Sequence, residues 1–137
     1  MTMPTFTHLN FGWNAEPNAP DIQLKQEGTT LVASVRPNPY VFPEYGDVSR
    51  IAVSFFDCSK YRVTSVNDHG WYLGQCRFSK LAPSWGEFYE ISGDTFDDLD
   101  ATPWTPMEGA GSHHFHFYLR DEALEVKARD WSMRAET

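Results

Sequence analysis

The strongest constraint on the fold is a period of two in residues His113 to Trp131, where apolar and polar side chains alternate on both sides of a charged turn. This period is typical of β-strands with one buried face. If the turn is centred between Asp121 and Glu122, the two halves form a hairpin with all its apolar side chains on one face. The facing pairs are then Leu119 with Leu124, Phe117 with Val126, and Phe115 with Ala128. The polar outer face pairs Tyr118 with Glu125, His116 with Lys127, and His114 with Arg129.

The second half of this stretch, Glu122 to Arg134, also has a helical alternative. It is rich in good helix formers, and Glu125 and Arg129 have the spacing of an i,i+4 ion pair. Val126 suits the interior of a strand, and the register with the preceding run also favours a strand. We therefore predict a strand and keep the helix as the alternative.

Similar alternation recurs along the rest of the chain. The expected elements are an edge strand in Phe6 to Phe11, a hairpin in Asp21 to Arg36 turning at Glu27-Gly28, a central strand in Val48 to Cys58, a third hairpin from Tyr61 to Val66 and Trp71 to Phe78, and a strand in Glu87 to Ser92. In the Asp21 to Arg36 hairpin, Leu24 would face Leu31 and Ile22 would face Ala33. The sequence thus predicts one mostly β domain over residues 1–137, an antiparallel β-sandwich or strongly bent sheet of about seven or eight strands with at most one short helix.

Three segments lie outside the predicted sheet. Residues 1–20 form an irregular N-terminal arm, apart from the edge strand. Pro37 to Asp47 is a loop of prolines and aromatics, since proline lacks the N–H that a sheet interior requires. Residues 93–111 form a long acidic loop with room for one helical turn near Asp97 to Asp100. Loops of this length in a compact domain are often functional.

The charge distribution is most uneven around that loop. Between Lys80 and Arg120 there are thirty-nine residues with no Lys or Arg and with seven Asp or Glu. Carboxylates mixed with aromatic residues suit the binding of a basic protein. The negative charge raises the rate at which the two proteins associate, and aromatic rings can become buried in the interface. Many acidic loops, however, only keep a protein in solution. The candidate partner-binding residues are Asp94, Asp97, Asp98, Asp100, Glu87, Glu90, Trp85, Tyr89 and Trp104.

Motifs of catalysis and cofactor binding are weak in this sequence. Asp98 and Asp100 begin like a calcium loop, but Pro103 stands where that loop requires glycine. No Gly-x-Ser-x-Gly elbow and no glycine-rich phosphate loop occurs. His114 and His116 could hold a metal in the manner of cupins, although the Glu, Gly and His that follow in cupins have no counterpart here. We expect no cofactor and no catalytic residue, with this histidine pair as the alternative metal site.

The net charge of −8 disfavours direct binding to nucleic acid or anionic membranes and favours basic partners. The N-terminus has no secretory signal and no stretch is long enough to span a bilayer, so we expect a cytoplasmic protein. In that compartment Cys58 and Cys76 are expected to be reduced rather than joined, although a hairpin near Asn67-Asp68 could bring them together.

The first functional hypothesis is a non-catalytic acidic protein that neutralises a basic partner, as bacterial immunity proteins and antitoxins neutralise nuclease toxins. The second is a small-molecule or metal-binding β protein, with the option of enzyme activity, that uses the His113 to His116 strand. The third is an assembly subunit whose loop from Pro37 to Tyr45 packs on a partner.

Overall fold

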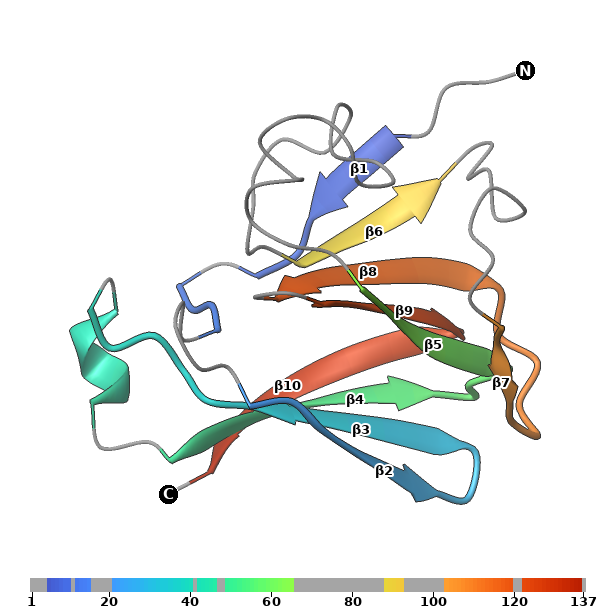
Figure 1. The fold of residues 1–137 in the computed structure, drawn as a ribbon, viewed down its shortest axis with the longest axis horizontal. Coiled ribbons are helices and arrows are strands. Elements are labelled where there is room, and N and C mark those ends of the chain that lie inside the picture. The colour runs from blue at the N-terminus through green and yellow to red at the C-terminus, as the bar shows by residue number, and fades with distance from the viewer. Residues whose placement is uncertain are drawn as a thin grey trace.

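The computed structural model describes residues 5–10, 12–15, 21–40, 42–46, 49–65, 88–92, 103–119 and 122–136. Within these ranges the chain forms two antiparallel sheets, one of six strands in the order β1-β6-β8-β9-β5-β7 and one of four in the order β10-β4-β3-β2 (Figure 1). The strands are β1 (Thr5–His8), β2 (Gln23–Glu27), β3 (Thr30–Val35), β4 (Arg50–Phe56), β5 (Lys60–Ser65), β6 (Phe88–Ser92), β7 (Thr105–Pro106), β8 (His113–Leu119), β9 (Glu122–Ala128) and β10 (Asp130–Glu136), and the one described helix is the 3₁₀ turn η1 (Pro43–Tyr45). The prediction of an all-β fold is confirmed.

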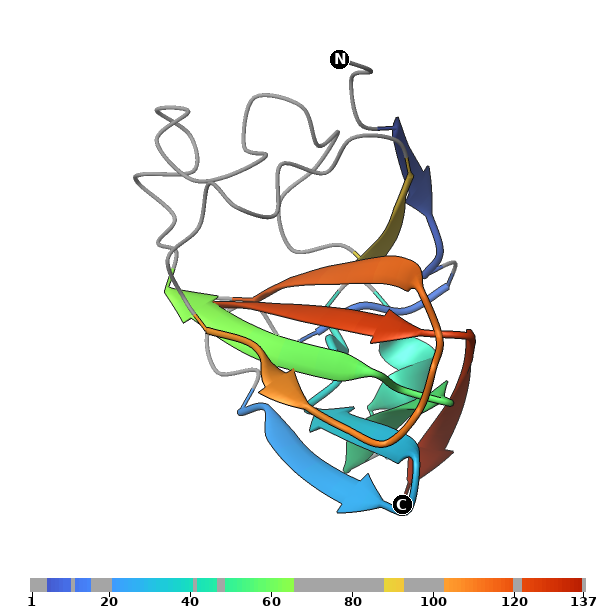
Figure 2. The ribbon, with the colours of Figure 1, turned by 90° about the vertical axis from the view of Figure 1, so that its right-hand side faces the viewer.

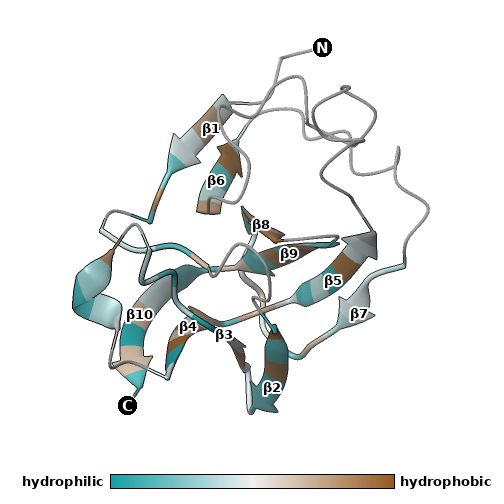
Figure 3. Cartoon of the chain, turned by 60° about the vertical axis from the view of Figure 1, so that its left-hand side comes forward, coloured by the Kyte–Doolittle hydropathy of each residue, from teal (hydrophilic) through white to brown (hydrophobic). Residues whose placement is uncertain are grey.

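The two sheets face each other across one hydrophobic core (Figure 2). Phe55 of the four-stranded sheet packs against Phe88 and Phe115 of the six-stranded sheet, with ring centroids 5.9 and 5.5 Å apart. Figure 3 shows a hydrophobic band between hydrophilic residues on each of β2 and β5. The other fully buried core residues include Leu31, Ala33, Val35, Ile51, Val53, Phe117, Leu119, Leu124, Val126 and Ala128.

Two of the three predicted hairpins are present among the described residues, β2 with β3 and β8 with β9, but each register differs from the prediction by two residues. Phe117 lies opposite Leu124 rather than Val126, and Leu24 lies opposite Ala33 rather than Leu31. The reason is that only two residues separate the paired strands, a loop length that matches the natural strand twist. Because the shift is an even number, every apolar side chain keeps its predicted face.

The stretch from Glu122 to Arg134 is extended, as predicted, and the helical alternative is wrong. It is nevertheless two strands, because the chain leaves the six-stranded sheet after Ala128 and enters the four-stranded sheet at Asp130. At this corner the Arg129 N–H donates to the Phe56 carbonyl at 2.9 Å. The division into β9 and β10 and the short β7 raise the number of strands above the predicted seven or eight.

Other predicted elements are placed as expected. The strand within Val48 to Cys58 is β4, which lies between β10 and β3 with Ile51 to Phe55 all buried. The edge strand near the N-terminus is β1, which pairs with β6. The predicted return strand Trp71 to Phe78 and the helical turn at Asp97 to Asp100 lie outside the described residues. Within the described part of the chain, no helix has the length and apolar character that crossing a bilayer would require.

Cys58 is buried in the core. Cys76, the other cysteine of the chain, lies outside the described residues, so whether the two are joined stays untested. Burial raises the pKa of the Cys58 thiol to about 11, and this effect outweighs a backbone hydrogen bond at Lys60 that lowers the pKa. The neutral thiol therefore contributes stability that is fully present below pH 9 and is lost as the pH rises towards 11.

We expect this thiol to be unreactive in the folded protein. In a Cys76→Ser background at pH 8, an aromatic disulfide reagent should modify folded Cys58 about 100-fold more slowly than the same residue in denaturant, because far less thiolate is present. Equal rates in the two states would show that Cys58 is accessible and ionisable.

Candidate functional site

The face of the six-stranded sheet that points away from the hydrophobic core carries a cluster of polar side chains. Four ionisable residues of this face are almost fully buried, each 1–3% exposed. They alternate along their strands with side chains that face the core, which places them on the opposite side of the sheet. We call them, with the tryptophan that contacts them, the polar cluster: Arg62, Trp104, His114, His116 and Glu125.

Glu125 is the centre of the polar cluster. Its Oε1 lies 2.8 Å from Nε2 of His114, and its Oε2 accepts from Nε of Arg62 at 2.9 Å. Arg62 and Glu125 are direct cross-strand partners on β5 and β9. Both carboxylate oxygens are thus engaged by groups from the two neighbouring strands, so Glu125 joins β5, β9 and β8 across the sheet.

Trp104 lies over the basic members of this face. Its ring centroid is 4.2 Å from Cζ of Arg62 and 4.6 Å from Nζ of Lys60, which are cation–π distances. The same ring meets His114 edge-on at a centroid distance of 6.1 Å. Trp104 is partly exposed, so it is the member of the polar cluster that water reaches most readily.

His114 and His116 lie side by side, with ring planes 4° from parallel and centroids 6.4 Å apart. They lie on the polar face of the hairpin as predicted, but this face is buried, because each histidine is 2% exposed. They lie opposite Lys127 and Glu125, not opposite Arg129 and Lys127 as predicted. The reason is that a strand's polar face can be buried when opposite charges on neighbouring strands compensate one another.

The alternative metal site at His114 and His116 has no complete set of ligands among the described residues. Nε2 of His114 already contacts Glu125, and the described part of the chain holds no group of three or more potential ligands from His, Cys, Asp or Glu. The histidine pair therefore stays a prediction. Elemental analysis of the purified protein tests it, since a bound transition metal at one atom per chain would favour it.

The predicted partner-binding residues are only partly described. Asp94, Asp97, Asp98, Asp100, Glu87 and Trp85 lie outside the described residues. Glu90 lies on β6 with its side chain 32% exposed, and its Oε2 is 2.9 Å from Nδ1 of His113. Tyr89 is 1% exposed and packs against the rings of Phe6 and His8, so its expected role as an exposed anchor does not fit this conformation. Trp104 is partly exposed and belongs to the polar cluster.

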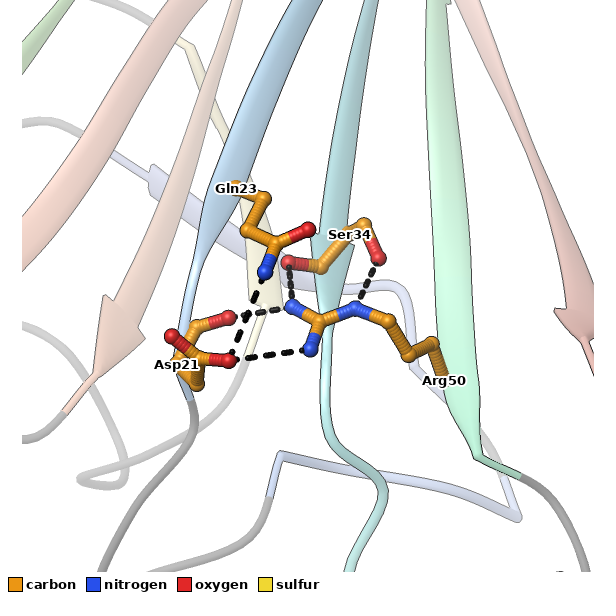
Figure 4. A network of polar contacts seen from close by, with 4 residues as sticks. All are labelled: Asp21, Gln23, Ser34 and Arg50. Atoms are coloured by element: carbon orange, nitrogen blue, oxygen red, sulfur yellow. Dashed lines mark hydrogen bonds and ion pairs between the residues drawn. The ribbon is translucent and has the colours of Figure 1, made fainter.

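A second polar network lies on the outer face of the four-stranded sheet (Figure 4). Arg50 of β4 donates to the Oδ2 of Asp21 at 3.1 Å and to the Ser34 carbonyl at 2.8 Å, with further bonds to the Ser34 hydroxyl and the Asp21 carbonyl. Gln23 also reaches Asp21, at 3.5 Å. These bonds tie the start of β2 to β3 and β4, and Arg50 forms part of the wall of a shallow groove of about 450 Å³.

The aromatic loop has one conspicuous side chain. Tyr40 is 75% exposed and is the only large hydrophobic residue exposed in the described ranges. Its N–H donates to Oδ1 of Asn38, which is itself 5% exposed. The hypothesis that this loop packs on a partner therefore stays open as a prediction.

The sequence-based reasoning missed Arg62 and Glu125 as a functional group. A signal for them exists, because opposite charges on polar-face positions of two strands indicate a cross-strand pair. This signal identifies the pair only when β5 is known to lie beside β9, and the two strands are far apart in the sequence.

Comparison with models of protein families, with curated proteins and with solved structures finds no match to this chain. Inferences about its function therefore depend on its residues and their geometry.

Proposed function

We propose that this protein is a non-catalytic acidic binding protein that neutralises a basic protein partner, as immunity proteins and antitoxins neutralise nuclease-like toxins in the bacterial cytoplasm. The observation that carries the proposal is the base-free interval between Lys80 and Arg120, with its seven carboxylates. A negative field of this kind attracts cationic proteins and repels nucleic acid.

The sheet supports the proposal by holding the acidic loop at its start and near its end. β6 precedes the loop and pairs with β8, with Phe88 fully buried. β7 follows the central part of the loop and pairs with β5. It comes directly after Trp104, whose ring packs on the cationic groups of Lys60 and Arg62. Binding residues attached to a rigid scaffold lose less conformational entropy on association than residues on an unanchored chain.

Two described carboxylates of the interval contribute to the negative surface. Glu108 is exposed, and Glu90 is partly exposed beside His113. A nuclease must present a positive groove to the phosphate backbone of its substrate. An acidic surface that occupies that groove would prevent substrate binding without any chemical step.

Reversing charge within the loop tests this function. The triple variant Asp97→Lys, Asp98→Lys, Asp100→Lys should slow association with the basic partner by about 10-fold or more and weaken its dependence on salt, because steering depends on these charges. Its thermal stability should change little. Stopped-flow association rates at several salt concentrations provide the measurement.

A matched control reverses three carboxylates elsewhere. The variant Glu16→Lys, Glu44→Lys, Glu136→Lys changes the net charge by the same amount at positions outside the interval. It should slow association much less than the loop variant. If the two triple variants slow association equally, only the net charge matters and the loop is not the site.

The partner for these measurements is sought in the gene next to that of this chain. Its product should be basic and toxic when expressed alone in a bacterial host, and co-expression of this chain should restore growth. Toxicity that this chain does not relieve, or a neighbouring gene of ordinary metabolism, would contradict the proposed function.

A further inference from the structure

The four edge strands of the two sheets differ in how well they are protected against pairing with another chain. β1 has four residues, β7 has two and includes Pro106, and β2 has five and carries the exposed pair Lys25 and Glu27. Short length, proline and lysine are the usual protections of an edge. β10 has seven residues, none of them Pro or Lys, and β4 is its only neighbour among the described strands.

The edge of β10 that faces away from β4 presents backbone groups at alternate residues. The Glu136 carbonyl faces β4, because it accepts from the Ser49 N–H at 2.8 Å. In an antiparallel ladder the N–H and C=O of one residue point to the same side, and the next residue points to the other. Trp131, Met133 and Ala135 therefore direct their backbone groups outward. In agreement, the Trp131 N–H donates to its neighbour's side chain, Oδ1 of Asp130, at 2.8 Å.

The sequence of β10 is complementary to itself in one antiparallel register. If Ser132 lies opposite Ser132 of a second copy, Asp130 faces Arg134 of that copy, and Trp131 faces its Met133. Asp130 and Arg134 are exposed, so opposite charges meet at the surface. Trp131 and Met133 are partly buried against the core, so pairing them covers apolar surface that is now accessible.

We propose that β10 pairs with β10 of a second copy of this chain about a two-fold axis at Ser132, joining the two four-stranded sheets into one. The outward N–H and C=O of Trp131 bond to Met133 of the second copy, and the Asp130 carboxylate exchanges its own backbone contact for the guanidinium of Arg134. An axis at Met133 would instead place Asp130 opposite Glu136, where like charges repel. The interface is isologous, so each favourable pair occurs twice.

This dimer is independent of the proposed partner-binding function, since β10 belongs to the other sheet and lies outside the acidic interval. Sedimentation velocity of the full chain from about 10 µM to about 1 mM should show the mass rise from 15.7 kDa to twice that value. A mass that stays at one chain over the whole range overturns the proposal.

Two kinds of variant locate the interface. Met133→Pro removes an outward N–H and leaves the bonds to β4 intact, so it should abolish the dimer while the circular dichroism spectrum is retained. Asp130→Arg places like charges opposite each other and should weaken dimerisation by about 10-fold, whereas the double variant Asp130→Arg, Arg134→Asp should restore it. This exchange of charges decides the question even if Met133→Pro fails to fold.

Two control variants alter surfaces that other dimers would use. Exchanging the charges of β2 with Lys25→Glu and Glu27→Lys should leave the dimer unchanged, as should Tyr40→Ser in the aromatic loop. A dimer that is lost with Tyr40→Ser, or that survives both Met133→Pro and Asp130→Arg, would place the interface elsewhere and overturn the β10 pairing.

Discussion

Replacing Glu125 with Gln is expected to lower the free energy of unfolding by about 3 to 5 kcal/mol, the usual cost of removing one partner from a buried ion pair. The carboxylate contacts both His114 and Arg62, whose side chains are 2% and 1% exposed. An amide offers one oxygen in place of two and turns an N–H towards a donor, so the guanidinium loses its compensating charge inside the protein. Urea denaturation followed by tryptophan fluorescence measures the loss.

Glu90→Gln is the matched control, because Glu90 also contacts a histidine at nearly the same distance. Its Oε2 lies 2.9 Å from His113, but the two side chains are 32% and 56% exposed. Water replaces the lost contact there, and exposed pairs contribute about 0 to 1 kcal/mol. Similar small losses in both variants would show that Glu125 is not buried as described.

Replacing Gly111 with Ala is expected to destabilise the fold by about 3 kcal/mol or more and to lower Tm by about 10 °C. A Cβ at Gly111 would lie 2.0 Å from the Arg129 nitrogen and 2.1 Å from the Ala128 carbonyl carbon. These are backbone atoms at the corner where the chain passes from β9 to β10, so no side chain can move aside.

The neighbourhood of Gly111 explains why the cost cannot be avoided by a small shift. The Gly111 N–H donates to the Asp57 carbonyl at 2.8 Å, and the Ser59 hydroxyl donates to the Gly111 carbonyl at 2.8 Å. Asp57 lies between β4 and β5, at the other described crossing between the sheets. A displaced residue 111 would therefore disturb both crossings at once.

Ser112→Ala provides the control for Gly111→Ala. Ser112 is exposed and adjacent, and exposed substitutions usually change stability by less than about 0.5 kcal/mol. Differential scanning calorimetry of the two variants gives both values of Tm. If Gly111→Ala unfolds within about 2 °C of the unaltered protein, the close approach to the β9–β10 corner is not present in solution.

Local patterns in the sequence predicted the strands and the faces of their apolar residues. Phe115, Phe117 and Leu124 are in the core as expected, because alternation depends only on the two-residue period of a strand. The pairing of these residues was wrong by two positions, since alternation repeats every two residues and cannot distinguish registers that differ by that amount.

Local sequence patterns could not predict that the polar face of the six-stranded sheet is buried. His114 and Glu125 alternate with core residues in the same way as the solvated side chains of a surface strand, yet they are buried. Their burial depends on Arg62, which comes from a strand about sixty residues away and lies directly opposite Glu125. The acidic interval, in contrast, is visible in the sequence, while most of its candidate residues lie outside the described ranges.

The sequence by itself determined the class of the fold, the core-facing side of each strand and the location of the surplus negative charge, because all three depend on residue types and short spacings. Only the tertiary structure decided that Ala128 and Asp130 belong to different sheets, that Glu125 holds Arg62 and His114 in the interior, and that β10 is left at an edge. These features arise from contacts between segments distant in sequence, and the free energy of such contacts depends on which strands become neighbours after folding.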